Sequence, residues 1–185
     1  MKIQQILRMA CATLLAGILT INSAYAANNV SLFYGSKSLD DVSWQPVEDQ
    51  QEIGFMLDFQ FSDLPLSVAF DYLASDDTGV FEGDTYKGET TELHLGIRQY
   101  IDEGKTLVPY IGGGVAAVEG KYSGRGRLER DEATGIWVGI GFNWMLSKEF
   151  HIGADFRFSS AELTLFNKEV DGGGVHLGAT AGFSF

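Results

Sequence analysis

The last eleven residues of the chain, VHLGATAGFSF, alternate strictly between apolar side chains and polar or small ones. Val175 and the terminal Phe185 belong to the apolar set, and His176 belongs to the other. A period of two predicts a β-strand with one apolar face. An apolar strand ending on an aromatic residue would promote association at the edge of a soluble sheet, but it suits a closed barrel in a bilayer. We therefore expect further strands of this kind, enough to close a barrel.

Seven more stretches of alternating or apolar sequence precede this strand. They lie at residues 30–36, 53–61, 66–73, 92–101, 107–119, 135–144 and 150–159. Polar connections at 37–51, 75–90, 121–131 and 160–174 are long, whereas those at 63–65, 102–105 and 146–149 are short. Alternating long and short connections, an even strand count and both chain ends on the short-turn side are typical of an outer-membrane barrel. The predicted fold is all-β, an eight-stranded antiparallel up-and-down transmembrane β-barrel.

Five charged residues of these strands share one side. They are Asp58, Asp71, Arg98, Asp155 and Arg157. A soluble lipocalin-like barrel would turn its apolar residues inward, and burial of these ions in a soluble sandwich would be costly. We therefore expect them to line a polar lumen. They could form an ion-pair and water network that fills the interior, or they could set the selectivity of a narrow ion path.

Residues 1–26 have the pattern of a cleaved signal peptide. Lys2 and Arg8 precede an apolar run, and Ala24-Tyr25-Ala26 forms a small-x-small cleavage site. The run is short for a membrane-spanning helix, which is the alternative interpretation. Because Cys11, the single cysteine, lies within this segment, we expect no disulfide or thiolate metal site in the mature protein. Residues 27–185 are then one outer-membrane β-barrel domain.

Charge limits the partners of the mature chain. Without residues 1–26, 11 basic residues remain against 25 acidic ones, a formal net charge of −14. Nucleic acid is an unsuitable partner for such a chain, since phosphate binding needs clustered cations. The third long connection is the basic exception, with Lys121, Arg125, Arg127 and Arg130. These residues are either ordinary solvated side chains or contacts for lipopolysaccharide phosphates.

All three histidines, His94, His151 and His176, fall on the predicted inward side. Strand direction places His151 near the short-turn rim and His176 near the opposite rim, so these two are expected to lie a barrel height apart. His176 with Ser159 or Ser160 is the one pairing that suggests a hydrolase, but an inward orientation disfavours attack on lipid. We predict no catalytic residues, no metal site and no cofactor.

The segment PYIGGGV from Pro109 to Val115 and the terminal aromatic residue resemble the small outer-membrane β-barrels of Gram-negative bacteria, the superfamily of the OmpA barrel, OmpX and OmpW. The resemblance implies that Phe183 and Phe185 form the C-terminal signal read by the barrel-assembly machinery. It also implies a location in the outer membrane of a Gram-negative bacterium. Members of this superfamily include tethers, adhesins, serum-resistance factors, narrow channels and lipid-modifying enzymes.

Taken together, these patterns predict a monomeric, non-enzymatic anchor that presents surface loops to lipopolysaccharide, other cells or host molecules. The first alternative is a small porin or channel for small solutes. The second is a lipid A modifying enzyme that uses His176.

Overall fold

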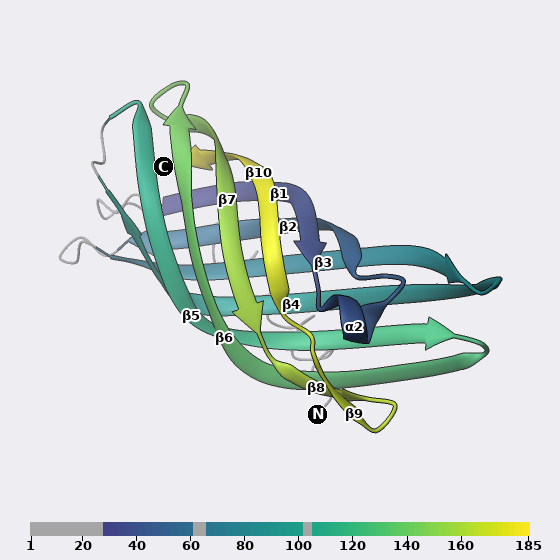
Figure 1. The fold of residues 1–185 in the computed structure, drawn as a ribbon. Coiled ribbons are helices and arrows are strands. Elements are labelled where there is room, and N and C mark those ends of the chain that lie inside the picture. The colour runs from purple at the N-terminus through teal and green to yellow at the C-terminus, as the bar shows by residue number, and fades with distance from the viewer. Residues whose placement is uncertain (1–27, 61–65, 102–104) are drawn as a thin grey trace.

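The computed structural model describes residues 28–60, 66–101 and 105–185. Eight antiparallel strands close into a barrel in the order β1-β10-β7-β6-β5-β4-β3-β2 (Figure 1). Their bounds are β1 Asn28–Ser38, β2 Asp49–Gln60, β3 Ser67–Phe81, β4 Asp84–Tyr100, β5 Leu107–Gly124, β6 Arg127–Met145, β7 Phe150–Ser160 and β10 Gly174–Ser184. The predicted fold class is confirmed. The predicted signal peptide, 1–26, lies outside the described residues.

Pairing between the two ends of the chain closes the ring. β1 lies between β2 and β10, and its register with β10 runs from Asn29 opposite Ser184 to Ser38 opposite Val175. The Asn28 amide donates to the Phe185 carbonyl at 2.8 Å, and the Phe185 amide donates back at 2.9 Å. A closed ladder satisfies the backbone groups that a free sheet edge would leave unpaired, which a lipid environment requires.

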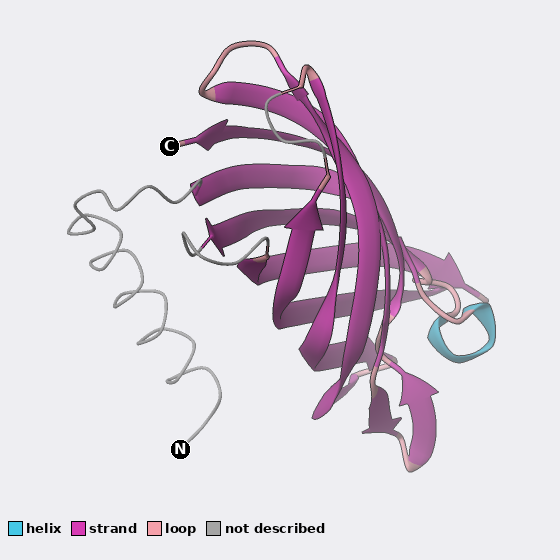
Figure 2. Cartoon of the chain, turned by 90° about the vertical axis from the view of Figure 1, so that its left-hand side faces the viewer, coloured by secondary structure: helices cyan, strands magenta, loops and turns pink. Residues whose placement is uncertain are grey.

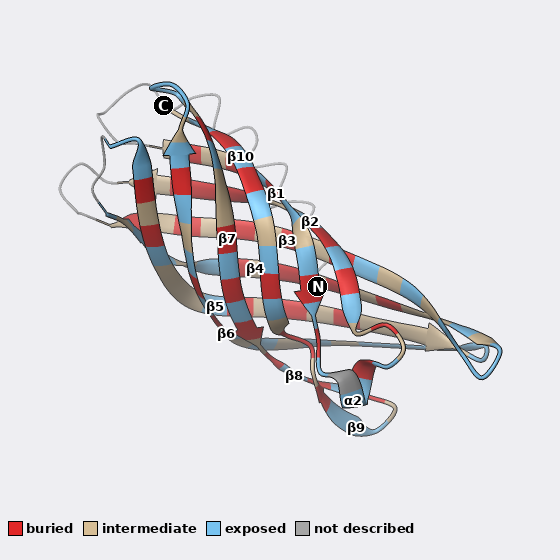
Figure 3. Ribbon diagram, turned by 45° about the horizontal axis from the view of Figure 1, so that its top comes forward, coloured by how far each residue is buried: buried red, intermediate tan, exposed pale blue. Residues whose placement is uncertain are grey.

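Side chains alternate between the lumen and the outside along each barrel strand, visible as alternating bands in Figure 3. On β6, Ile136 and Val138 are 61% and 55% exposed, whereas Trp137 between them is 2% exposed. The exposed apolar side chains form a band around the barrel. It includes Leu32, Ile53, Leu95, Ile97, Ile111, Val115, Ile140, Phe142, Ile152, Phe156, Phe158 and Leu177. This outward band and the polar interior have the amphipathicity of a transmembrane barrel.

The prediction of a long loop is wrong for two of the four long connections. Residues 75–90 and 121–131 lie mostly in strands, because β3 and β4 form one extended hairpin and β5 and β6 form another. Each turns through two residues with positive φ, at Glu82-Gly83 and at Arg125-Gly126. Positive φ at both central residues matches the right-handed twist of the flanking strands. These extensions lack the apolar alternation of the barrel strands, because polar side chains such as Asp77 and Thr78 occupy both of their faces.

The extensions rise on one side of the barrel, where β3 to β6 run past the ends of the other strands (Figure 1). The last β3 residue paired with β2 is Asp76, so β3 continues for five residues, about 17 Å. β4 and β5 remain paired as far as Tyr86 and Gly124, which joins the two hairpins into one sheet. The barrel thus carries a four-stranded wall at the end away from its termini.

The other two long connections contain structure of their own. Residues 37–51 include the end of β1 and a short helix, α2 (Asp41–Trp44), drawn in cyan in Figure 2. Residues 161–173 include a small hairpin of β8 (Glu162–Leu165) and β9 (Lys168–Asp171). Lys37 therefore belongs to a barrel strand. The sequence had indicated a loop at this position, and that prediction is wrong.

An apolar cluster joins these connections to the wall. Its buried members are Leu39, Trp44, Val47, Leu163, Leu165 and Val170. The Trp44 indole N–H donates to the Asp171 carbonyl at 2.8 Å, and the Tyr122 hydroxyl donates to the Gln45 carbonyl at 2.8 Å. We refer to residues 39–51, 76–91, 119–133 and 161–173 as the head. Its apolar core covers the barrel mouth, so the head is a packed unit and not a set of independent loops.

Candidate functional site: the barrel lumen

The structure brings the five predicted lumen residues into one ion-pair network. Arg98 contacts Asp58 at 2.5 Å and Asp71 at 2.7 Å. Arg157 contacts Asp155 at 2.6 Å and the same Asp71 oxygen at 2.8 Å. All five side chains are at most 2% exposed. Asp71 on β3 therefore links two arginines from β4 and β7 across the interior.

Aromatic side chains complete this layer. The Arg98 and Arg157 guanidinium carbons lie 5.8 and 5.5 Å from the centre of the Trp137 ring, within cation–π range. A Cβ on Gly112 would lie 3.0 Å from the Trp137 ring, so this glycine makes room for the indole. The hydroxyls of Tyr100 and Tyr110 donate to Asp58 and Asp155 at 2.5 and 2.7 Å.

A second polar layer lies nearer the head, and the sequence analysis missed three of its members. Lys37 contacts Glu92 at 2.5 Å and donates to the Thr90 hydroxyl and the Gly172 carbonyl, each at 2.8 Å. Glu52 accepts from His176. Glu52 and Glu92 stand on the inward side of the alternation and could have been included on that signal. Lys37 carried no such signal, because the residues after it have no strand pattern.

The two layers are joined through His94. Its Nδ1 lies 3.1 Å from an Arg157 nitrogen, and its Nε2 lies 2.6 Å from Glu92. The described lumen contains five buried carboxylates and three buried Lys or Arg side chains. Hydrogen bonds thus run without a break from Tyr100 through both layers to Lys37.

Ser159, His176 and Glu52 have the connectivity of a catalytic triad. The Ser159 hydroxyl lies 2.9 Å from His176 Nε2, and His176 Nδ1 lies 2.9 Å from Glu52. However, all three side chains are at most 1% exposed, and the single hydroxyl proton of Ser159 is donated to Glu92 at 3.2 Å. Ser160, the other predicted partner, donates to Asp171 instead. The arrangement faces the interior of the barrel and not the lipid.

The other histidines do not assemble a metal site in the described part of the chain, where no group of three or more potential ligands is suitably placed. His151 lies 2.9 Å from the Ser31 hydroxyl and 3.3 Å from the Ser184 hydroxyl. His94 and His176 are neighbours, with ring centres 6.3 Å apart. Each histidine is thus hydrogen-bonded to side chains of other residues inside the barrel.

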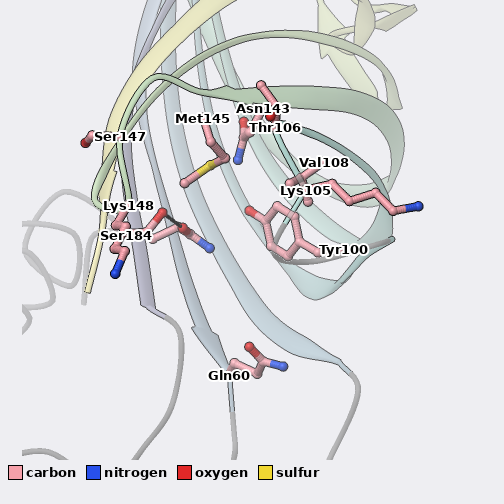
Figure 4. Close-up of a pocket in the computed structure, with 11 residues that line it drawn as sticks. Gln60, Tyr100, Lys105, Thr106, Val108, Asn143, Met145, Ser147, Lys148 and Ser184 are labelled. Atoms are coloured by element: carbon pink, nitrogen blue, oxygen red, sulfur yellow. Dashed lines mark hydrogen bonds between the residues drawn. The ribbon is translucent and has the colours of Figure 1, made fainter.

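A pocket of about 530 Å³ lies at the short-turn end of the lumen (Figure 4). Tyr100 and Asn143 form part of its wall, and Lys105 and Lys148 stand at its rim. Because Tyr100 also donates to Asp58, one wall of the pocket is hydrogen-bonded to the ionic network. At the other end, Ser75 and Thr90 bond Gln50, which donates to the Val47 carbonyl beneath the head.

The four basic residues predicted to face lipopolysaccharide lie on the β5–β6 hairpin but not together. Lys121 and Arg130 are register partners on its outward face. Arg125 occupies the turn, where a hydrogen bond to Asp84 raises the pKa of its guanidinium, and Arg127 belongs to the inward face. Lys121 and Arg130 both contact Glu119, at 3.3 and 2.5 Å. Lys87 of β4, which was not predicted from the sequence, lies on the same outward face of the wall.

The two C-terminal aromatic residues point outward. Phe183 and Phe185 are 58% and 62% exposed, and the Phe183 ring centre lies 5.3 Å from that of Phe150. They are thus on the lipid-facing surface at the short-turn end, beside the first residue of β1.

The fold, outward apolar band and polar lumen together define a small transmembrane β-barrel. The sequence matches the family described as outer membrane protein beta-barrel domain over residues 11–183, and the chain belongs to that family. No curated protein matches it.

Solved structures of small outer-membrane proteins share the fold. Neisserial surface protein A is 12% identical, with a TM-score of 0.63 over 89% of this chain and 100% of that one. OprG from Pseudomonas aeruginosa is 13% identical, with a TM-score of 0.66 over 86% and 96%. Ail, the attachment invasion locus protein of Yersinia pestis, is 16% identical, with a TM-score of 0.61 over 88% and 100%. At these identities the likeness extends to the fold alone.

Proposed function

We propose that the protein is a non-conducting, monomeric anchor in the outer membrane of a Gram-negative bacterium, and that it presents the head as an interaction surface. The observation that carries this proposal is the filled lumen. Arg98, Asp71 and Arg157 span the interior from strand to strand, and their side chains are at most 1% exposed. An ion crossing the barrel would have to separate these pairs, at a substantial electrostatic cost.

We infer an orientation in which the chain termini and the pocket face the periplasm and the head faces the outside of the cell. Short turns on the periplasmic side and longer connections outside are the rule for such barrels. Phe183 and Phe185 would then present their rings at the periplasmic interface, where the assembly machinery can read the end of the chain.

Lipopolysaccharide is the proposed lipid partner. Lys87, Lys121 and Arg130 lie on the outward face of the wall, directly beyond the apolar band. A lipid with its acyl chains against this band would bring its phosphates to the level of these cations. Glu89 and Glu119, on the same face, could contribute through divalent cations.

The net negative charge of the head as a whole disfavours a free polyanion as the main ligand. A Yersinia Ail structure similar to this chain was solved in complex with the heparin analogue sucrose octasulfate. Here the head contains sixteen acidic and six basic residues. An exposed surface with this excess of carboxylates would repel a sulfated ligand.

We also propose that the protein is not an enzyme, despite its Ser159-His176-Glu52 arrangement. The serine nucleophile has no access to lipid or water, and a carboxylate occupies its other side. Incubation of the folded protein with a fluorophosphonate probe should leave Ser159 unlabelled. Covalent labelling that disappears in Ser159→Ala, together with altered lipid A in cells that express the protein, would support the lipid A modifying alternative.

Planar bilayer recording tests the anchor against the channel. The folded protein should give no conductance steps above the bare membrane, with an open porin reconstituted in parallel as the positive control. Reproducible steps that change in size in Arg98→Gln would establish the porin alternative. Heat-modifiable migration on gels would confirm that each preparation is folded.

A further inference from the structure

The inward face of the wall carries a partly exposed aromatic surface above the barrel mouth. Tyr122 is central to it. Its ring centre lies 5.9 Å from that of Tyr86, 6.0 Å from that of Phe166 and 6.1 Å from that of Trp44. Trp44 is fully buried beneath, whereas the other three rings keep part of their surface accessible. We call Tyr86, Tyr122 and Phe166 the aromatic shelf.

One carboxylate lies beside the shelf, and a second lies further along the same row. One row of inward-facing positions crosses the four wall strands as Asp77, Gly88, Tyr122 and Glu129. Gly88 adds no side chain of its own to this row, and Val47 and Gln50 pack over it, between Asp77 and Tyr122. Tyr122 is thus bordered directly by Glu129 on β6, whereas Asp77 on β3 lies on the far side of Val47.

A third acid approaches from residues 39–51. One carboxylate oxygen of Glu48 is buried without a hydrogen-bond partner among the described residues. Burial raises the pKa of Tyr122, with Tyr86 and Glu48 adding to the effect, so the phenol stays neutral and presents an intact π face. In the next row the wall has one cation, Arg127, at its β6 edge, opposite Gly124.

We propose that the aromatic shelf is the docking site for a basic peptide segment of a partner protein, with an arginine side chain stacked on Tyr86 and Tyr122 and paired with Glu129, and with a further basic side chain of the segment reaching Asp77. The inference rests on the proposed role of the head as an interaction surface and names the chemistry of its partner. Ring faces and carboxylates both attract cations, and a planar guanidinium can use both contacts at once. The acidic excess of the head adds long-range attraction.

The test measures binding of fluorescent nona-arginine to the folded full chain in uncharged detergent micelles. Two double variants remove the same charge from opposite faces of the same wall. Asp77→Asn/Glu129→Gln alters the shelf, whereas Asp76→Asn/Glu89→Gln alters the outward face. We expect the first to raise the Kd about fivefold or more and the second to change it less than about twofold, since only the first pair lies on the same face of the wall as the rings.

Equal weakening by both double variants would overturn the proposal, because it would reduce the binding to overall charge. Tyr86→Leu should also weaken binding, by about threefold, and no change in this variant would remove the shelf from the site. Heparin, as the anionic probe, should not bind, and tighter binding of heparin than of nona-arginine would contradict the proposed partner class.

Recording of the same preparations in planar bilayers keeps the two proposals separate. Failure of nona-arginine to bind a silent barrel would refute the docking site and leave the anchor standing. Conductance by a barrel that binds the peptide at the shelf would refute the anchor and leave the docking site standing.

Discussion

The lumen and the head both contain many charged side chains but use them differently. In the lumen, Asp71 and Arg157 are fully buried and paired. In the head, Arg130 and Glu132 are about one-third exposed in a comparable pair at 3.0 Å. A buried ion without its partner is very unfavourable, whereas water replaces an exposed partner at little cost. Lumen charges therefore hold the barrel together, and head charges remain available to other molecules.

The substitution with the largest expected effect on this contrast is Asp71→Ala, because it leaves each of two buried arginines without one ion-pair partner. We expect a loss of about 4 kcal/mol in the free energy of unfolding. Urea unfolding in lipid vesicles, followed by tryptophan fluorescence, measures it. The head control Glu132→Ala should change stability by less than about 1 kcal/mol. Similar values for the two variants would show that lumen and head charges are equally solvated, which would remove the contrast.

Trp44→Ala tests whether the head is a packed unit separate from the barrel. The change removes a fully buried indole and its hydrogen bond to Asp171, and should destabilise the head by about 3 kcal/mol. Limited proteolysis should then cut within 161–173 while the barrel keeps its heat-modifiable migration. Loss of that migration would instead mean that barrel and head fold as one unit.

Tyr122→Phe removes a single hydrogen bond, to the Gln45 carbonyl, and keeps the ring. The expected loss of head stability is about 1 kcal/mol, since the carbonyl of exposed Gln45 can bond to water. The rate of proteolysis within 39–51 reports it. A loss as large as that of Trp44→Ala would show that this carbonyl behaves as a buried group.

Arg130→Gln should have the smallest effect, about 0.5 kcal/mol or less on stability. Its neighbours Glu119 and Glu132 can turn to water or to Lys121. Raising the salt concentration should reduce even this difference, because exposed pairs are screened. A loss of stability that persists at high salt would show that the ion pairs of Arg130 are shielded from water, like those of Arg157.

The barrel could be predicted because each of its strands has one apolar face. In 175–185 the alternation alone identified both the strand and the side that faces outward. The same period placed Asp58, Arg98 and Arg157 on the inward side. The wall could not be predicted in the same way, because 77–81 and 127–133 have polar residues on both faces. Two-residue turns such as Glu82-Gly83 and Arg125-Gly126 were the remaining signal.

The individual lumen contacts were also beyond the sequence. Periodicity places Glu92, His94 and His176 on one side of their strands, but it does not say which strands are adjacent around the ring or at what height each side chain lies. That Ser159 meets His176 depends on the register between β7 and β10, where Arg157 lies opposite His176.

By itself the sequence determined that the strands form a barrel and which face of each strand points outward. An alternation with a period of two can be recognised within a single strand, without knowing which strands are its neighbours. Only the tertiary structure decided that the lumen is filled, that Lys37 belongs to it, and that 39–51 and 161–173 pack into a head over the mouth. The physical reason is that an apolar face is a property of one strand. A salt bridge or a packed cluster instead requires residues far apart in the chain to meet, and ring closure and register bring them together.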